Sequence, residues 1–278
     1  MWPVPRPLED NGMLYSVCAS SSRKGERSDR LLALIPDVAA AARRYVPAAH
    51  FGGLHLLRDL AGRPEDPADH AALLWLYEKG LVQNSMGRQR YDDLLSRAPM
   101  GRCPFCGHRD VSTLDHQLPK SSYPLLAVLP DNLVPACSDC NHRKNDKVAA
   151  SSQTQTFHPY FENANHGRWL VARVVSLDPI AVVFAAEPDA AFTTTTQARI
   201  RHQFVQFRLA ALYGPQAVQQ ISGERLMLDR LRQHSGLAAV GEYLREAAAS
   251  WAAARSVNCW QHALYEALAA DPGFLTGT

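Results

Sequence analysis

The sequence lacks any long apolar run. None of its 278 residues lies in a stretch that approaches the roughly 20 uninterrupted apolar residues of a membrane helix. Residues 1–7 also lack the apolar run and cleavage site of a signal peptide. These absences predict a cytoplasmic protein that does not enter a membrane. Because thiols stay reduced in the cytoplasm, cysteines in close pairs are expected to bind metal and not to form disulfides.

A large excess of charge of one sign is also missing. The formal net charge is +2, so the charge does not by itself indicate nucleic-acid binding, as that of a strongly basic chain would. Lysine is scarce among the basic residues, yet Lys120, Lys144 and Lys147 all fall within residues 98–157. A hydrophobic content of 46% is ordinary for a globular protein, and 278 residues suffice for one large domain or two smaller ones.

Cysteine is sparse, with six residues in the chain, but four of them are arranged in pairs. The two Cys-x-x-Cys pairs consist of Cys103, Cys106, Cys137 and Cys140. Each pair can form a knuckle whose two sulfurs point at one ion, and two such knuckles are typical of a structural zinc site. The remaining two, Cys18 and Cys259, stand alone, so we expect them to be buried as small apolar side chains.

The first part of the chain, residues 1–97, is predicted to be a helical N-terminal region with an irregular start. A helix capped near Ser28 should be kinked or split at Pro36, because proline lacks the amide hydrogen that a helix interior uses. Further helical segments are expected at 51–60, after 67 and around 91–95.

The last part, residues 158–278, is predicted to contain a β-hairpin and several helices. Residues 169–177 and 180–184 are rich in β-branched side chains and flank an Asp-Pro turn. A helix is expected over 195–213, ending at Gly214-Pro215. Together with the N-terminal region and a motif region over 98–157, this predicts an α+β fold that is mostly helical.

The loop enclosed by the cysteine pairs carries residues suited to phosphodiester hydrolysis. We expect a strand that ends at His116, a second strand after Asn132 and a helix from Ser138. His116 suits a general base, because the ordinary pKa of histidine lies near neutrality. Asp115 and Asn141 offer the oxygen ligands that Mg²⁺ prefers. Hydrolysis needs both functions: a base for the attacking water and an electrophile at the phosphate.

The stretch from about 102 to 148 resembles the HNH, or His-Me finger, endonucleases with a ββα-metal site, in the branch that carries a four-cysteine structural zinc. The resemblance implies that His116 is the general base and that Asp115 and Asn141 hold Mg²⁺ or Mn²⁺. It implies that Asn132 braces the loop by hydrogen bonds and helps to hold the histidine. It also implies products with 5′-phosphate and 3′-hydroxyl ends, and a module embedded between the helical N-terminal region and the C-terminal hairpin and helices.

This chain departs from the family at one position. Many members have histidine where Asn141 stands, and His142 follows one residue later. One residue along a helix turns the side-chain direction by about 100°, so the two side chains cannot both face one metal ion. We take Asn141 as the ligand because it directly follows the last cysteine, and we interpret His142 as a phosphate contact or a surface residue.

Other polar side chains near the motif have two interpretations each. Lys120, Arg143, Lys144 and Lys147 are either contacts to nucleic-acid phosphates or ordinary solvated charges. His158 lies in an aromatic stretch that we interpret mainly as packing, with contact to substrate or metal as the alternative.

The chain also resembles stand-alone bacterial HNH proteins, which share its Asp-His-x-Leu-Pro-Lys, Asn-Leu-Val-Pro and His-Pro-Tyr-Phe motifs. Such proteins often sit in phage-defence or restriction gene clusters, sometimes beside an ATPase. The resemblance implies an antiviral endonuclease acting on double-stranded DNA, and it is compatible with a partner from the same operon or with a homodimer. Two alternatives stay open: an effector that cleaves RNA or tRNA, and a non-catalytic zinc-stapled module that binds nucleic acid or protein.

Overall fold

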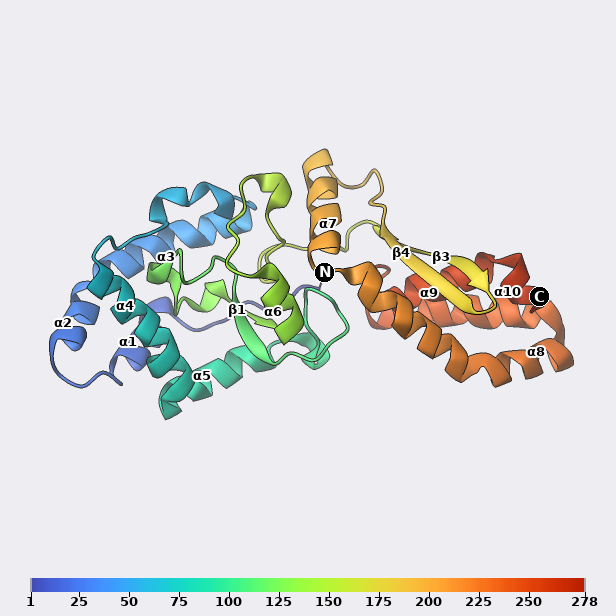
Figure 1. Cartoon of the computed structure of the whole chain (residues 1–278), viewed down its shortest axis with the longest axis horizontal. Coiled ribbons are helices and arrows are strands. Elements are labelled where there is room, and N and C mark those ends of the chain that lie inside the picture. The colour runs from blue at the N-terminus through green and yellow to red at the C-terminus, as the bar shows by residue number, and fades with distance from the viewer. Residues whose placement is uncertain (1, 278) are drawn as a thin grey trace. The chain divides into compact units, whose positions relative to one another are not determined.

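The computed structural model describes residues 2–277, and it confirms a mostly helical α+β protein with two small antiparallel sheets (Figure 1). The chain divides into two compact units, Met1–Asn163 and Ala164–Thr278. In the part of the chain that is described, no helix is both long and apolar enough to cross a bilayer.

The first unit contains six α-helices, a π-helix and a two-stranded sheet among its described residues. These are α1 (Asn11–Ala19), α2 (Glu26–Ala33), α3 (Ile35–His50), α4 (Pro67–Trp75), the π-helix (Leu76–Gln83), α5 (Ser85–Ser96), β1 (Thr113–His116), β2 (Leu133–Ala136) and α6 (Ser138–Lys144). The break between α2 and α3 falls at Leu34, just before Pro36, as expected. Residues 51–60 form two 3₁₀ turns instead of the expected helix.

One apolar core fills the first unit and joins the expected N-terminal and motif regions. The core takes side chains from the helices and from the loop that follows β1, including Leu14, Tyr45, Leu73, Leu81, Leu118, Leu126 and Leu129. Residues 98–157 therefore do not form a separate domain, and the three regions expected from the sequence become two units. The reason is physical: the enclosed loop is rich in leucine, and it buries those side chains against the N-terminal helices.

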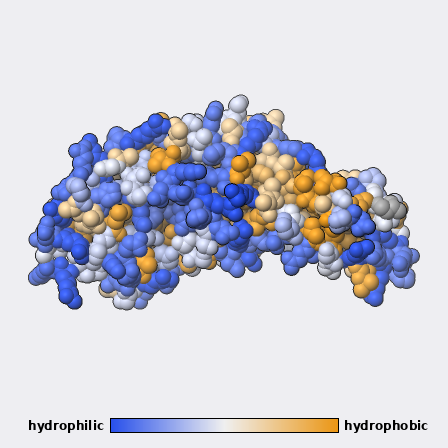
Figure 2. Space-filling view, viewed as in Figure 1, coloured by the Kyte–Doolittle hydropathy of each residue, from blue (hydrophilic) through white to orange (hydrophobic). Residues whose placement is uncertain are grey.

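The second unit is a β-hairpin packed on helices. Its elements are β3 (Leu170–Leu177), β4 (Ile180–Ala186), α7 (Thr194–Gln206), α8 (Leu209–Ala254), α9 (Trp260–Ala270) and α10 (Pro272–Thr276). The hairpin is confirmed, with Leu177 opposite Ile180 beside the turn and a register irregularity between Val174 and Ser176. Val175 and Val183 are 58% and 48% exposed, and Figure 2 shows apolar surface over this hairpin.

The expected helix over 195–213 is wrong in its end point. The break comes at Arg208, which has a left-handed φ of 50°, and α8 then continues through Pro215. Within α8, Gly236 has a φ of 85° and interrupts the helix. Across this interruption, Glu224 accepts a hydrogen bond of 3.3 Å from the Tyr243 hydroxyl. In a straight helix these residues would be about 28 Å apart, so α8 folds back on itself at Gly236.

Candidate metal centre and the adjoining Asp-His site

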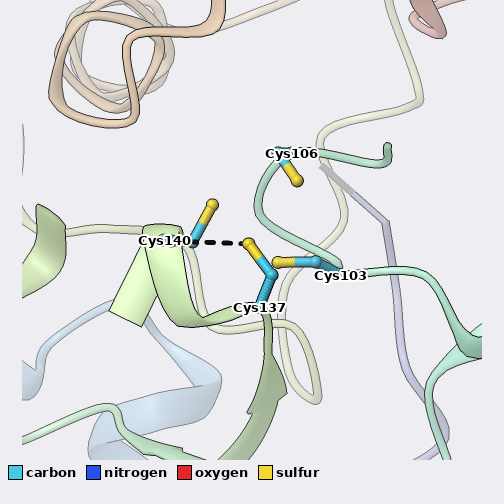
Figure 3. A group of neighbouring side chains, drawn as sticks. All are labelled: Cys103, Cys106, Cys137 and Cys140. Atoms are coloured by element: carbon cyan, nitrogen blue, oxygen red, sulfur yellow. Dashed lines mark hydrogen bonds between the residues drawn. The ribbon is translucent and has the colours of Figure 1, made fainter. Parts of the chain in front are cut away.

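The four paired cysteines converge on one point. Cys137 caps α6, and its Sγ accepts the backbone N–H of Cys140 at 3.4 Å. Cys103 and Cys106 come from the loop before β1, and all four sulfurs lie within 4.8 Å of one another (Figure 3). A tetrahedral ion with Zn–S distances of about 2.3 Å needs sulfurs about 3.8 Å apart. The cluster is buried and could hold a metal such as zinc.

The knuckle around the first cysteine pair is closed by backbone hydrogen bonds. The N–H of Gly107 donates to the carbonyl of Cys103 at 2.7 Å, and the N–H of Cys103 donates to the carbonyl of Arg109 at 2.9 Å. Gly107 has a φ of 61°, and a Cβ there would lie 2.9 Å from the Trp2 ring, so this position requires glycine. The Arg109 guanidinium then pairs with Asp139 on α6 at 3.0 Å, which joins the two knuckles.

The cysteine chemistry agrees with the spacing argument. Hydrogen bonds from the neighbouring thiols lower the pKa of Cys106 and Cys137. Burial raises the pKa of Cys103, and hydrogen bonds from the other three thiols raise that of Cys140, so two of the four sulfurs favour thiolate, the form that ligates metal. Cys18 and Cys259 are buried apart from the cluster, as expected of isolated cysteines.

The Asp-His pair lies beside this centre on β1. Strand β1 pairs with β2 in antiparallel register, with Asp115 opposite Val134 and His116 opposite Leu133. Helix α6 follows β2 and contacts β1. The order of strand, loop, strand and helix is the one expected from the sequence.

His116 is held in one tautomer. Its ring is 8% exposed, and Nε2 lies 2.8 Å from the carbonyl oxygen of Ala127. A carbonyl oxygen only accepts, so Nε2 carries the proton and Nδ1 keeps its lone pair. Burial lowers the pKa of His116 to about 3, which keeps the ring neutral near pH 7. A neutral imidazole with one free nitrogen can act as a base.

Asp115 is buried and only half satisfied. Its Oδ1 accepts a hydrogen bond of 3.2 Å from Lys144 Nζ, which also donates to the His116 carbonyl at 2.5 Å. Its Oδ2 is buried and has no partner among the described residues. Burial raises the pKa of Asp115 to about 6, although Lys144 opposes the shift. A buried carboxylate oxygen left without a donor is a position where a cation could bind beside the Lys144 ammonium.

Lys144 is placed differently from the expected phosphate contact. Its side chain is 3% exposed, and its ammonium is directed at Asp115 and the backbone of His116. In this arrangement it neutralises the carboxylate from inside the protein and does not reach the surface. It is a residue of the site whose role the sequence interpretation missed.

Asn132 is fully buried and ties the enclosed loop together. Its Oδ1 accepts the N–H of Leu118 at 2.7 Å, and its Nδ2 donates to the carbonyls of Leu118 and Leu126 at 2.9 and 3.1 Å. The carbonyl of Asn132 also accepts the N–H of Gln117 at 2.8 Å. These bonds fix the chain on both sides of the loop that begins directly after His116.

Replacing Asn132 should therefore destabilise the first unit. Asn132→Ala leaves one buried amide and two buried carbonyls without partners, so we expect a loss of roughly 3 kcal/mol in the free energy of unfolding. Urea denaturation measures this loss. Asn11→Ala is the matched control, because the Asn11 side chain forms no hydrogen bond with the described residues. A loss below about 1 kcal/mol for Asn132→Ala would contradict the bracing role.

Asn141 and His142 are neighbours on α6 that differ in exposure. Asn141 is half-buried, and its Nδ2 lies 3.5 Å from the Thr113 hydroxyl, two residues before Asp115 on the same face of β1. His142 is exposed. Both residues line an open groove of about 450 Å³. No hydrogen bond joins Asn141 to Asp115 within the described residues, and Asp115 is not among the residues that line this groove.

The remaining predicted contacts divide between surface and interior. Lys147 is exposed and Arg143 is half-buried, while Lys120 pairs with Glu78 at 3.1 Å. His158 is 0% exposed, so packing is the interpretation that agrees with its position.

The buried His158 supports the turn that carries Asn132. Its Nε2 lies 2.9 Å from the hydroxyl of Tyr45 and 2.9 Å from the carbonyl of Asp131. The Asp131 carboxylate in turn accepts two hydrogen bonds from Arg6, at 2.7 and 2.8 Å. Arg6 in the N-terminal segment thus holds Asp131, the residue before Asn132. No local motif in the sequence predicts this contact.

Among curated proteins, Protein ea31 of Escherichia phage lambda is 36% identical to this chain over 152 residues. The matched stretch covers 53% of this chain and 51% of the phage protein, so the chain spans about half the length of that relative. The relative's name states no activity. No family model matches the chain, and no solved structure matches it.

Proposed function

We propose that the protein is a metal-dependent endonuclease of the HNH type, in which β1, β2 and α6 form the ββα-metal module. One observation carries the proposal. His116 is neutral with Nδ1 unprotonated, and its neighbour Asp115 presents a buried oxygen without a partner. Phosphodiester hydrolysis requires a base for the attacking water and a metal ion at the phosphate. His116 would supply the base, and the unpartnered Asp115 oxygen would bind the ion.

In the proposed mechanism, Nδ1 of His116 takes a proton from water, and the resulting hydroxide attacks phosphorus in line with the departing 3′-oxygen. The bond from Nε2 to Ala127 orients the ring and stabilises the imidazolium that forms. Asp115 and Asn141 would hold the divalent ion, Mg²⁺ or Mn²⁺, which supplies charge stabilisation at the phosphate when it is bound. Asn132 keeps the loop between His116 and β2 in place.

The zinc in this proposal is structural. Its four ligands are all cysteines, which leaves no open position for substrate. The cluster joins the loop before β1 to the start of α6, and α6 carries Asn141 and Lys144. The ion therefore fixes the helix against the strand that holds Asp115 and His116.

Double-stranded DNA is the proposed substrate, and antiviral defence or restriction is the proposed setting. The exposed His142, which lines the groove beside α6, and the exposed Lys147 are the proposed phosphate contacts. A relative encoded by a phage agrees with a role in the conflict between bacteria and phages. An ATPase or another protein of the same operon, or a second copy of the chain, would act as partner.

The first test is cleavage of supercoiled plasmid by the zinc-loaded protein. Cutting should require added Mg²⁺ or Mn²⁺ and should stop when EDTA is added. Asn141→Ala should slow cleavage by at least about 10-fold, because loss of a metal-site group commonly costs that much. His142→Ala is the comparison on the same helix: loss of a proposed phosphate contact should slow cleavage less than loss of a metal ligand.

The outcomes separate the alternatives. Cleavage of RNA but not of DNA would reassign the substrate. Binding of DNA with no metal-dependent cleavage, with or without a candidate partner, would favour the non-catalytic zinc-stapled module. A larger loss for His142→Ala than for Asn141→Ala would move the metal ligand to His142.

A further inference from the structure

We propose that Tyr77, a residue outside the motif region, positions the imidazole of His116. The inference deepens the proposed function and rests on it. The rings of Tyr77 and His116 meet edge to face, with centroids 4.6 Å apart and planes inclined by 61°. Aromatic pairs favour this geometry, so the contact is an attractive one.

The contact matters because one hydrogen bond fixes the His116 ring among residues 2–277. The bond from Nε2 to Ala127 anchors one end of the imidazole, but it leaves the ring free to tilt about that bond. Tyr77 packs against the ring and removes this freedom. A base must meet its water within hydrogen-bond reach, so a small tilt of Nδ1 lowers the rate.

The Tyr77 ring also contacts Lys120. The Lys120 Nζ lies 5.0 Å from the Tyr77 ring centroid and forms an ion pair of 3.1 Å with Glu78, the residue after Tyr77. His116 is the last residue of β1 and Lys120 lies in the loop that follows, while Tyr77 and Glu78 are consecutive. The first turn of the π-helix is therefore a platform that holds two residues of the motif.

The platform itself is rigid. A Cβ at Gly80 would lie 2.8 Å from the carbonyl oxygen of Cys18 on α1, and a Cβ at Gly87 would lie 1.9 Å from the carbonyl oxygen of Gly80. These close approaches press the π-helix between α1 and α5. Single π-helical turns often occur at functional sites, which agrees with a positioning role.

The test compares Tyr77→Phe, Tyr77→Leu and Tyr77→Met. The Tyr77 hydroxyl forms no hydrogen bond with the described residues, so Phe should keep the wild-type rate. Leu and Met remove the aromatic edge, and each should lower kcat about 10-fold with little change in KM for DNA. Met fills more of the space, which guards against a Leu variant that fails to fold. Tyr15→Leu, another buried tyrosine of this unit, controls for lost stability.

A second measurement does not depend on cleavage. In the zinc-loaded protein without DNA or Mg²⁺, the ring protons of His116 should show NOEs to Tyr77 and a ring-current shift. The shift should persist in Tyr77→Phe and vanish in Tyr77→Leu. Absence of these signals, or a wild-type kcat in both Leu and Met variants, would overturn the inference. An inactive wild type with the NOEs intact would overturn the nuclease proposal and leave the contact standing.

Discussion

His116→Ala is expected to cut DNA about 100- to 10,000-fold more slowly than the wild type at saturating metal, the range that a general base contributes. The substitution removes the unprotonated Nδ1 beside Asp115 and leaves the Ala127 carbonyl without its donor. Affinity for DNA should change little, because the imidazole is buried and does not carry charge near pH 7. Single-turnover cleavage and a DNA-binding titration on the same preparation measure the two effects separately.

The matched control is His234→Ala, an exposed histidine of the second unit. It should retain wild-type cleavage. Added imidazole should restore part of the activity of His116→Ala, because a free base can enter the space that the ring leaves. Cleavage by His116→Ala at the wild-type rate would remove His116 from the mechanism, whatever the outcome for the metal site.

The site could be predicted from the sequence where the chemistry depends on local spacing. The two Cys-x-x-Cys pairs indicate a metal cluster because each pair brings its sulfurs together within one turn, and the structure places all four within 4.8 Å. The separation of Asn141 from His142 also follows from helix geometry alone. Lys144 was within reach of the same argument: it lies three residues after Asn141, on the same helix face, and that face packs on β1.

Contacts between distant segments could not be predicted in this way. Arg6 and Asp131 are separated by 125 residues, and Tyr77 meets His116 from an element whose π-helical turn has no sequence signature. Such pairs depend on how the whole unit packs. Hydrophobic periodicity and motif spacing in the sequence carry no information about that packing. The same holds for Gly236, where a positive φ folds α8 back: several helices are expected in this region, but the sequence pattern does not place the break at this residue.

The buried charges show how the two sites depend on each other. Asp115 and Lys144 are 5% and 3% exposed, so each relies on the other for compensation. Lys144 is at the end of α6, and α6 begins at the cysteine cluster. If α6 moved, Asp115 would lose its partner and His116 would lose a hydrogen bond to its carbonyl. Helix α6 therefore links the cysteine cluster to the Asp-His pair.

Loss of the structural metal should consequently have the largest effect on folding. Structural zinc contributes on the order of 10 kcal/mol of apparent free energy in small zinc-dependent folds. That is comparable with the whole stability of a typical domain, about 5–15 kcal/mol. Cys137→Ser removes a thiolate and also the sulfur that accepts the Cys140 amide. We expect the first unit to lose its cooperative unfolding transition, while the second unit, which has its own core, retains helical structure.

Calorimetry and metal analysis test this expectation together. The wild type should contain one zinc per chain, and Cys137→Ser should contain much less. Cys18→Ala is the matched control, because Cys18 is equally buried in the first unit but lies outside the cluster, so it should keep both the zinc and the transition. A Cys137→Ser protein that unfolds like the wild type would mean that the four cysteines do not hold the first unit together. In that case the rigidity of the Asp-His pair would have to come from the core and the Asn132 bonds alone.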